Sequence, residues 1–304
     1  MLTSDLSNNA ASSTSTRPPS SVSSALRAIV DDIDNSELAW DIAASKGQPA
    51  SYRLSTANNL RRRERAYALA HRVYQSCGYV SPDSGNGLCV SNYDAQPETI
   101  TLLADDPSGS AAGTISLVFD SDAKLPCDEL YSAEVNALRD AGRQVAEVTR
   151  LVIAENHRNS KVLLLRLINF SFIYAVHVRR FTDIVIEVNP RHVSYYRRLL
   201  FFKPIGIERP CARVNGAPAV LLHLDLSVYV REVLRVGGAG ASAKERTLYP
   251  HLFPIQDERA VAEFLVRHHK PMTADEARYF GLDPIPSHQA EECAAQNELA
   301  ASAG

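Results

Sequence analysis

Apolar residues recur along the chain at two different spacings, which together predict a mixture of helices and strands. Apolar positions three to four residues apart predict a helix over 58–77, ended by Gly78. Its solvent side is expected to carry Arg61, Arg62, Arg63, Arg65 and Arg72. Two apolar runs, 98–104 and 112–119, lie on either side of the turn-rich sequence 105–109 (DDPSG). This arrangement is typical of a β-hairpin.

The stretch 145–206 has the clearest order of elements. VAEVTRLVIA predicts a strand, NSKVLLLRLINFSFIYAVHVRR a long apolar helix, FTDIVIEVNP a second strand, and RHVSYYRRLLFF an amphipathic helix. Before it, 125–138 is expected to form a loop and a short helix. After it, Asn215-Gly216 between two apolar runs predicts a tight turn and a final hairpin.

The two ends of the chain have a different composition. Residues 1–25 are rich in Ser, Thr, Asn and Pro without periodic apolar positions, so we expect disorder there. Residues 25–45 are expected to form a short helix in which Trp40 docks against the rest. We define an N-terminal segment 1–50, a main domain 51–232 and an extension 233–304.

The extension begins with a Gly/Ala-rich linker over 237–243 and continues with helical patterns. These patterns predict helices over 257–268 and 273–279. Thr273 and Glu276 have the spacing of a capping box at the start of the second helix. The tail beyond Pro284 is expected to be loose.

Charge is unevenly distributed along the chain. The 304 residues carry a net charge of −3, so attraction of the whole chain to nucleic acid is not expected. Between Arg150 and Arg213, however, there are twelve Lys/Arg and only four Asp/Glu. Such a patch steers acidic partners, although a solvated helix face has the same composition.

Several classes of site and location are not indicated by the sequence. The five cysteines are irregularly spaced without a Cys-x-x-Cys pair, which favours reduced thiols in a cytoplasmic protein over zinc or disulfides. No signal peptide, metal-ligand spacing or Gly-x-Ser-x-Gly motif is present. The apolar run 162–178 is interrupted by Arg166, Asn169 and His177, so we expect a buried core helix and not a membrane span.

The string LPCDELYSAEVNALRDAGRQVAEVTRLVIAENHR resembles the long-chain N-acyl amino acid synthases, and its Glu-x-x-Arg strand is similar to that of the acyl-homoserine-lactone synthases. The order of elements resembles the GCN5-related N-acetyltransferase fold. The resemblance covers 52–226 and is sharpest over 125–158. It implies an α/β (α+β) fold in which a mixed, mainly antiparallel sheet is flanked by helices, here with a helical C-terminal extension.

The same resemblance implies the reaction. A long-chain acyl group would pass from acyl carrier protein to the α-amine of an amino acid, giving an N-acyl amino acid. No cofactor of the enzyme is implied, because 4′-phosphopantetheine arrives on the carrier protein. The identity of the acceptor, the acyl length and the oligomeric state stay open.

Glu147 is the candidate base for this reaction. A carboxylate in a partly closed cleft has a raised pKa and could accept a proton from an ammonium. An ion pair between Glu147 and an arginine such as Arg150 is the structural alternative. Strand alternation places Glu147 and Thr149 on one face and Arg150 on the other, where Arg150 would brace a loop or meet the acceptor's carboxylate.

In this fold the strand separates from its neighbour after Thr149 and leaves free N–H groups for the thioester or pantetheine. Val152 and Ile153 occupy these positions. The helix start at His157, Arg158, Asn159 and Ser160 would bind a phosphate group. Members that use coenzyme A have glycines here, and their absence favours a carrier-protein donor. Ser160 could equally be a helix cap.

Two further parts of the site follow from the resemblance. Asn189 and Tyr196 match the family's Asn-(x)6-Tyr element, and Tyr196 would protonate the leaving thiolate unless it serves only in packing. An acyl tunnel would use Leu102, Ile115, Leu117, Val118 and the helix 163–173. The acidic carrier would bind the basic residues Arg158, Lys161, Arg197, Arg198 and Lys203.

Two rival functions remain. A signal-lactone synthase would need S-adenosylmethionine, but the chain reads Gly113-Thr114-Ile115-Ser116 where an arginine is usual, and Gly78-Tyr79-Val80 replaces an acceptor-side tryptophan. A non-catalytic acyl-binding protein would use the same pocket as a sensor. Asn92-Tyr93-Asp94 marks either an acidic acceptor-side loop or a simple turn.

Overall fold

The computed structural model describes residues 39–43, 50–81 and 85–283. The expected disorder of 1–25, most of the helix expected over 25–45, and the tail beyond Pro284 therefore lie outside the described residues. The division into 1–50, 51–232 and 233–304 stays a prediction.

Nine strands build one mixed sheet in the order β1-β2-β3-β4-β5-β6-β9-β7, with β8 paired to β9. Neighbouring strands run antiparallel except β5 and β6, which are parallel in the described part. The bounds are β1 Trp40–Ala43, β2 Ala50–Thr56, β3 Ile100–Asp105, β4 Ala111–Phe119, β5 Val145–Ile153, β6 Asp183–Val188, β7 Lys203–Pro204, β8 Arg209–Cys211 and β9 Ala217–Asp225.

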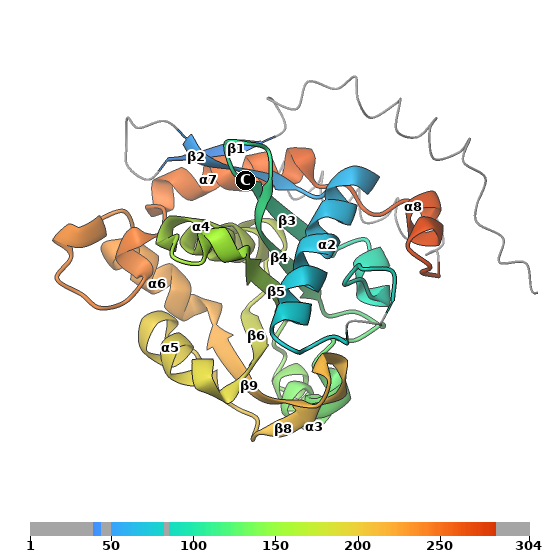
Figure 1. Cartoon of the computed structure of the whole chain (residues 1–304). Coiled ribbons are helices and arrows are strands. Elements are labelled where there is room, and N and C mark those ends of the chain that lie inside the picture. The colour runs from blue at the N-terminus through green and yellow to red at the C-terminus, as the bar shows by residue number, and fades with distance from the viewer. Residues whose placement is uncertain (1–38, 44–49, 82–84, 284–304) are drawn as a thin grey trace, which may run out of the picture. The chain divides into compact units, whose positions relative to one another are not determined.

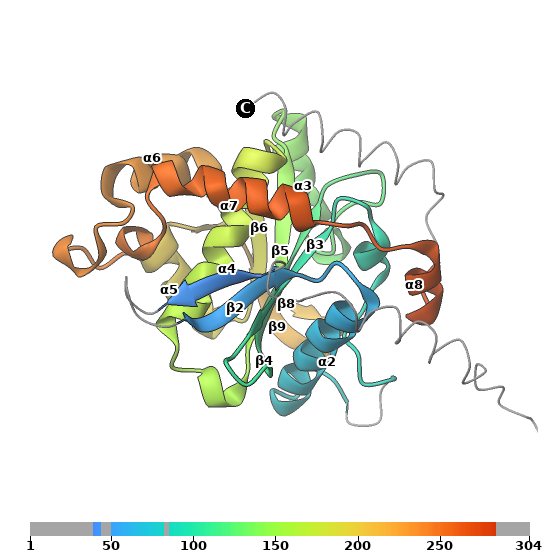
Figure 2. The ribbon, with the colours of Figure 1, turned by 90° about the horizontal axis from the view of Figure 1, so that it is seen from above.

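Helices cover both faces of the sheet (Figures 1 and 2). One face carries α2 and α3, while α4 and α7 lie on the other. The bounds are α2 Leu60–Ser76, α3 Asp128–Asp140, α4 Lys161–Ile173, α5 Pro190–Leu200, α6 Leu226–Val236, α7 Ile255–His268 and α8 Ala274–Tyr279. The mixed, mainly antiparallel sheet flanked by helices is the fold expected from the sequence.

The main hydrophobic core lies between the sheet and α4. This helix is apolar on almost every side, begins at the Ser160 cap, whose hydroxyl accepts from the Leu163 N–H at 3.3 Å, and continues into a π-helical turn over Tyr174–Val178. The stretch Lys161–Val178 is long and apolar enough to cross a membrane, but 67% of it is buried within the fold. It is the core helix expected from its polar interruptions.

The C-terminal extension contributes to this core. Leu265 of α7 is fully buried with α4 residues, and Phe264 packs edge-on against Trp40 at 5.5 Å between ring centroids. Trp40 does dock, but the predicted helix around it was wrong in the described part, because Trp40 begins strand β1 and pairs with Leu54. The capping box of Thr273 and Glu276 at α8 is confirmed.

Helix α2 shows a second departure from the pattern. The sequence pattern placed Arg62 and Arg63 on the solvent-exposed side of this helix, yet both side chains are buried. Arg63 forms an ion pair with Glu276 of α8 at 2.7 Å and donates to the Lys270 carbonyl at 2.6 Å. The extension covers this face of α2, so its arginines have protein partners in place of water.

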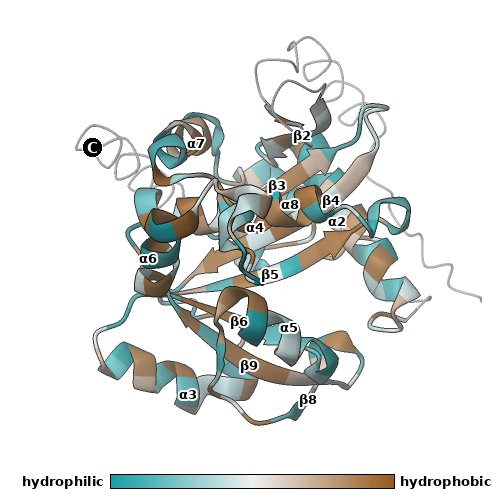
Figure 3. Ribbon diagram, turned by 90° about the vertical axis from the view of Figure 1, so that its left-hand side faces the viewer, coloured by the Kyte–Doolittle hydropathy of each residue, from teal (hydrophilic) through white to brown (hydrophobic). Residues whose placement is uncertain are grey.

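Strands β5 and β6 separate soon after they meet. Their parallel pairing covers only Val145↔Asp183, Ala146↔Ile184 and Glu147↔Val185. Beyond Glu147, β5 stays with β4, and β6 stays with β9. Figure 3 shows β5 diverging from β6 and β9 like the arms of a V. The predicted separation of the middle strands is therefore present. It begins after Glu147, two residues earlier than the expected position after Thr149.

A β-bulge interrupts β5 at the point of separation. Ser116 of β4 pairs with Thr149, and Thr114 pairs with Val152, so Arg150 and Leu151 together oppose one residue of β4. Arg150 adopts a φ of 51°, in the left-handed region that a bulge can require. The extra residue changes the alternation of side chains, so Arg150 lies with Thr149 and Val152 on the α2 face.

Candidate active site

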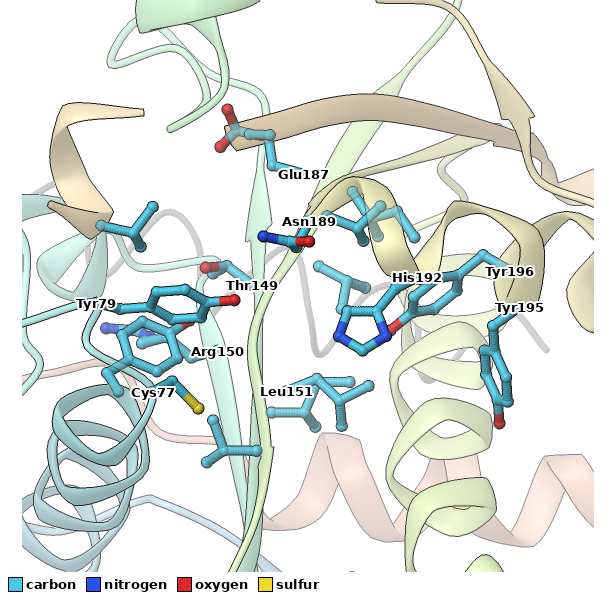
Figure 4. A pocket seen from close by; sticks show the side chains of 18 of the residues that line it. Cys77, Tyr79, Thr149, Arg150, Leu151, Glu187, Asn189, His192, Tyr195 and Tyr196 are labelled. Carbon is cyan, nitrogen blue, oxygen red and sulfur yellow. The ribbon is translucent and has the colours of Figure 1, made fainter. Parts of the chain in front are cut away.

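A cavity of about 460 Å³ occupies the gap between β5 and β6 and extends to both faces of the sheet. Tyr74 and Cys77 of α2 line it on one side, and Tyr196 of α5 and Ile168 of α4 line it on the other. Figure 4 shows Cys77, Tyr79 and Arg150 on one side of the strands and His192, Tyr195 and Tyr196 on the opposite side. Its volume is typical of a small-molecule site.

Two carboxylates face this cavity from the neighbouring strands. Glu147 is 1% exposed, and its Oε2 accepts a hydrogen bond from the Cys127 N–H at 2.7 Å. Glu187 lies two residues beyond Val185, the partner of Glu147, and therefore projects from the same face of the sheet. Burial and the nearby Glu187 raise the pKa of Glu147 to about 8. Burial also raises the pKa of Glu187.

Glu187 has one occupied and one open oxygen. Its Oε2 accepts from Arg213 at 2.5 Å, whereas its Oε1 is buried without a hydrogen-bond partner in the described part of the chain. Arg213 also contacts Glu129 at 2.9 Å. The negative charge of the pair is thus balanced from the Glu187 side, because in the described part Glu147 is bonded to the N–H and the thiol of Cys127, which carry no positive charge.

Arg150 does not pair with Glu147, so the structural alternative proposed for Glu147 was wrong in that form. Its guanidinium forms a bidentate ion pair with Asp94, in which Nη1 lies 2.6 Å from Oδ2. It also donates a hydrogen bond to the Cys89 carbonyl at 3.1 Å. The expected opposite faces of Glu147 and Arg150 were also wrong, because the bulge rotates Arg150 toward α2. Arg150 holds the short 3₁₀ turn Asn92–Ala95 against the sheet.

Val152 and Ile153, the positions expected beside a thioester, line the cavity together with Thr149, which was expected to meet the acceptor or brace a loop. The Ala154 N–H donates to Ala112 of β4 at 2.8 Å. Successive N–H groups of a strand point to opposite edges, so the N–H of Ile153 points into the gap and that of Val152 points back to β4. Ile153 is therefore the free donor of the two, and Val152 contributes its side chain.

The helix start before α4 lies outside the cavity. None of His157, Arg158, Asn159 and Ser160 is among the residues that line it. His157 contacts Asp106 at 3.2 Å and Tyr52 at 3.3 Å, so it joins β5 to the β3–β4 turn. Arg158 pairs loosely with Glu155 at 3.6 Å. Ser160 is the α4 cap, which was its alternative assignment, while Arg158 and Asn159 are exposed.

Tyr196 lies on the wall opposite the carboxylates. Burial raises its pKa to about 12, and its ring packs edge-on against Phe202 at 5.8 Å. His192 is one helical turn earlier on α5 and lines the same cavity. Asn189 caps α5 by accepting from the Arg191 N–H at 3.2 Å. Tyr196 therefore both packs against Phe202 and lines the cavity.

The apolar part of the wall comes from one face of α4. Leu164, Ile168 and Phe172 recur every four residues and line the cavity with Ile115. Leu102, Leu117 and Val118, which the sequence suggested for a tunnel, do not line it but fill the core. A sequence cannot separate these roles, because both need apolar side chains.

The five residues expected to meet a carrier protein are all exposed. Arg197 and Arg198 belong to α5, Lys203 to β7, and Lys161 to the first turn of α4. In the described part of the chain, no group of three or more His, Cys, Asp or Glu side chains is placed to hold a metal ion.

Several lining residues were not predicted as site residues. Tyr79 accepts from Arg191 at 3.2 Å, which connects the end of α2 to the start of α5 beside the cavity. Glu187 and Arg213 form the second charged pair. The sequence signal for Glu187 was only an acidic residue inside an otherwise apolar strand, which alternation could have placed beside Glu147.

Comparison with known proteins identifies the family. The model of a family described as N-acyl amino acid synthase FeeM matches residues 65–225, more than half of the chain. The chain belongs to this family. It is an N-acyltransferase with the GCN5-related N-acetyltransferase fold. No curated protein matches the chain.

The solved structure of one member of the family has the same fold, and two other solved structures are less similar. FeeM, an N-acyl amino acid synthase from uncultured soil microbes, is 23% identical with a TM-score of 0.51, and the match covers 58% of this chain and 90% of FeeM. The coenzyme-A-dependent acyl-homoserine lactone synthase BjaI is 13% identical, with 76% and 90% covered and a TM-score of 0.41. The ribosomal-protein-S5-alanine acetyltransferase of Vibrio fischeri is 11% identical, with 62% and 96% covered and a TM-score of 0.42. The last two likenesses add no argument.

Proposed function

We propose that this N-acyltransferase moves a long-chain acyl group from acyl carrier protein to the α-amine of an amino acid. The observation that carries the proposal is the cavity between β5 and β6, which combines an apolar wall with two buried carboxylates. Amide formation from a thioester needs a base for the amine, a donor to the carbonyl and a proton for the thiolate. Glu147, the Ile153 N–H and Tyr196 supply these three functions from the wall of one cavity.

The proposed donor is a carrier protein because of what surrounds the cavity. The exposed basic residues Arg197, Arg198 and Lys203 follow the cavity-lining part of α5, where they would attract an acidic partner. The turn before α4 lacks the glycines that let backbone approach a pyrophosphate. Its His157 is already bonded to Asp106 and Tyr52.

The proposed acyl group is long because the α4 wall is apolar over two helical turns. Leu164, Ile168 and Phe172 would contact successive methylenes, each worth about 0.8 kcal/mol when removed from water. The acceptor would reach the carboxylates from the α2 side, past Tyr74 and Tyr79.

The test is a reaction of the full chain with palmitoyl-loaded acyl carrier protein and a mixture of the twenty amino acids. Mass spectrometry should detect an N-palmitoyl amino acid. Product from palmitoyl-coenzyme A and none from the carrier would contradict the donor. Glu147→Gln should retain acyl binding and lose turnover, whereas a sensor would show no turnover in either form.

A further inference from the structure

The cavity contains a second buried carboxylate, Glu187, that the assignment of Glu147 as base leaves without a role. A buried carboxylate is costly unless it is bonded on all sides, and Glu187 Oε1 has no partner among the described residues. The side chain is 9% exposed, and its other oxygen is held by Arg213. The open oxygen is therefore fixed in position and available to a donor that enters the cavity.

We propose that Glu187 is the receptor for the acceptor's ammonium group and shares its proton with Glu147. The inference rests on the proposed function and adds the acceptor subsite to it. An α-ammonium is the donor of suitable size and charge, because a carboxylate oxygen that is held in place beside a cavity accepts most strongly from a charged N–H group. The Cys127 N–H orients Glu147, and Arg213 orients Glu187.

The surroundings decide which carboxylate carries the charge before the acceptor arrives. Among the described residues no cation contacts Glu147, whereas Arg213 contacts Glu187. The proton is therefore held on the Glu147 side, and the pair titrates as one unit. The groups that act on Glu187 are Glu147 of β5, Cys127, Glu129 and Tyr131 in and before α3, and Cys211 and Arg213 around β8.

The proton balance of the reaction is complete with these groups. Binding of the ammonium at Glu187 displaces the proton of Glu147 to solvent. The ammonium then gives one proton to Glu147, and the neutral amine nitrogen bonds to the thioester carbon. The carbon–sulfur bond then breaks. The second proton of the nitrogen reaches the departing sulfur, by way of Tyr196 or water. The pair then holds one proton, as it did before the acceptor arrived, so one thiol and one proton leave per amide formed.

Glu187→Gln is the discriminating variant. Glutamine has the same shape as glutamate, and its amide oxygen can still accept a hydrogen bond from Arg213, but it carries no negative charge. With palmitoyl-loaded carrier and the amino acid that the wild type uses best, the acceptor KM should rise on the order of 10- to 100-fold. The KM for the carrier should stay within about twofold. Glu129→Gln is the matched control: it removes the other acidic partner of Arg213 but does not line the cavity.

Hydroxylamine distinguishes a chemical role from a structural one. It is neutral at pH 7 and needs no carboxylate to receive a charge. Glu187→Gln should therefore lose far less activity with hydroxylamine than with the amino acid. An equal loss with both acceptors, or an unchanged acceptor KM, would overturn the inference. Absence of N-acyl product from the wild type would instead overturn the proposed function itself.

Discussion

Arg150 and Asp94 form a buried ion pair that joins the bulge of β5 to the 3₁₀ turn before β3. The Asp94 side chain is 0% exposed and that of Arg150 is 7% exposed. Arg150 also lies over the ring of Tyr67, with its guanidinium carbon 5.4 Å from the ring centroid. The pair holds the edge of the cavity in place at the position where the strand departs from regular geometry.

Asp94→Asn should destabilise the fold strongly, because it leaves the buried Arg150 guanidinium without its counter-ion. Loss of one partner from such a pair costs about 3–5 kcal/mol, measurable as a lower unfolding free energy in urea. Asp41→Asn is the control, since Asp41 contacts Arg53 at 3.6 Å in an exposed pair and should change stability by less than about 1 kcal/mol. Equal effects of the two substitutions would contradict the assigned role.

The contribution of Glu147 to the free energy of unfolding should fall as the pH rises from mildly acidic to mildly alkaline. The carboxyl ionises near 4.5 in the unfolded chain and near 8 in the fold, so between these values unfolding releases its proton. The loss should approach about 1.4 kcal/mol per pH unit and stop above the folded pKa.

Glu147→Gln isolates this contribution, because glutamine does not titrate. The difference in unfolding free energy between wild type and Glu147→Gln, measured from pH 5 to pH 9, should change in favour of the variant as the pH rises. A difference independent of pH would mean that Glu147 is already ionised in the fold.

Ile168→Trp should shorten the acyl chain that the enzyme accepts. The side chain belongs to the α4 face that lines the cavity, and a larger ring there occupies the volume of several methylenes. We expect kcat/KM to fall at least about tenfold for a palmitoyl donor and to change little for an octanoyl donor. Ile168→Leu is the volume-matched control. Equal losses for both donors would indicate damage to packing and not a length limit.

Tyr196→Phe should slow the natural reaction if its hydroxyl protonates the leaving thiolate. General-acid catalysis is worth roughly 10²- to 10⁴-fold, so kcat with the carrier donor should fall within that range. A palmitoyl thiophenyl ester, whose thiolate leaves without a proton, should restore most of the rate. A comparable loss with that ester would assign Tyr196 to packing against Phe202.

Leu265→Ala in the C-terminal extension should destabilise the whole fold. Leu265 is 0% exposed within the core that includes α4, and removal of such a side chain costs about 2–5 kcal/mol. Arg259→Ala on the exposed side of α7, where Arg259 contacts Glu263 at 3.0 Å, should stay within about 0.5 kcal/mol. A small effect of Leu265→Ala would mean that the extension unfolds separately.

The sequence predicted most of the fold because its main elements follow their apolar patterns closely. The strand at Glu147, the apolar helix after Ser160 and the Asn215-Gly216 turn, where both residues have positive φ, are where the pattern placed them. Burial of Arg62 and Arg63 was not predictable from α2 alone. It depends on α8, whose contact with α2 is set by tertiary packing.

The site was less predictable because it depends on one inserted residue and on contacts between distant elements. Strict alternation fails at Arg150, since a bulge leaves no distinct apolar pattern. Glu187, the second carboxylate beside Glu147, is 40 positions further along the chain. Their proximity is evident only once the register of β5 and β6 is known. His157 matched a phosphate-binding position by order along the chain, but its ring is bonded to Asp106 and Tyr52.

The early end of the β5–β6 pairing has a kinetic consequence. In the proposed reaction, a donor that enters over α5 and an acceptor that enters past α2 approach the cavity from opposite faces of the sheet, so neither would have to leave before the other enters. Both can be held at once, and the acyl group can pass straight from sulfur to nitrogen without resting on a side chain of the protein. The opening in the middle of the sheet would thus bring the acyl donor and the amine acceptor into contact from its two faces.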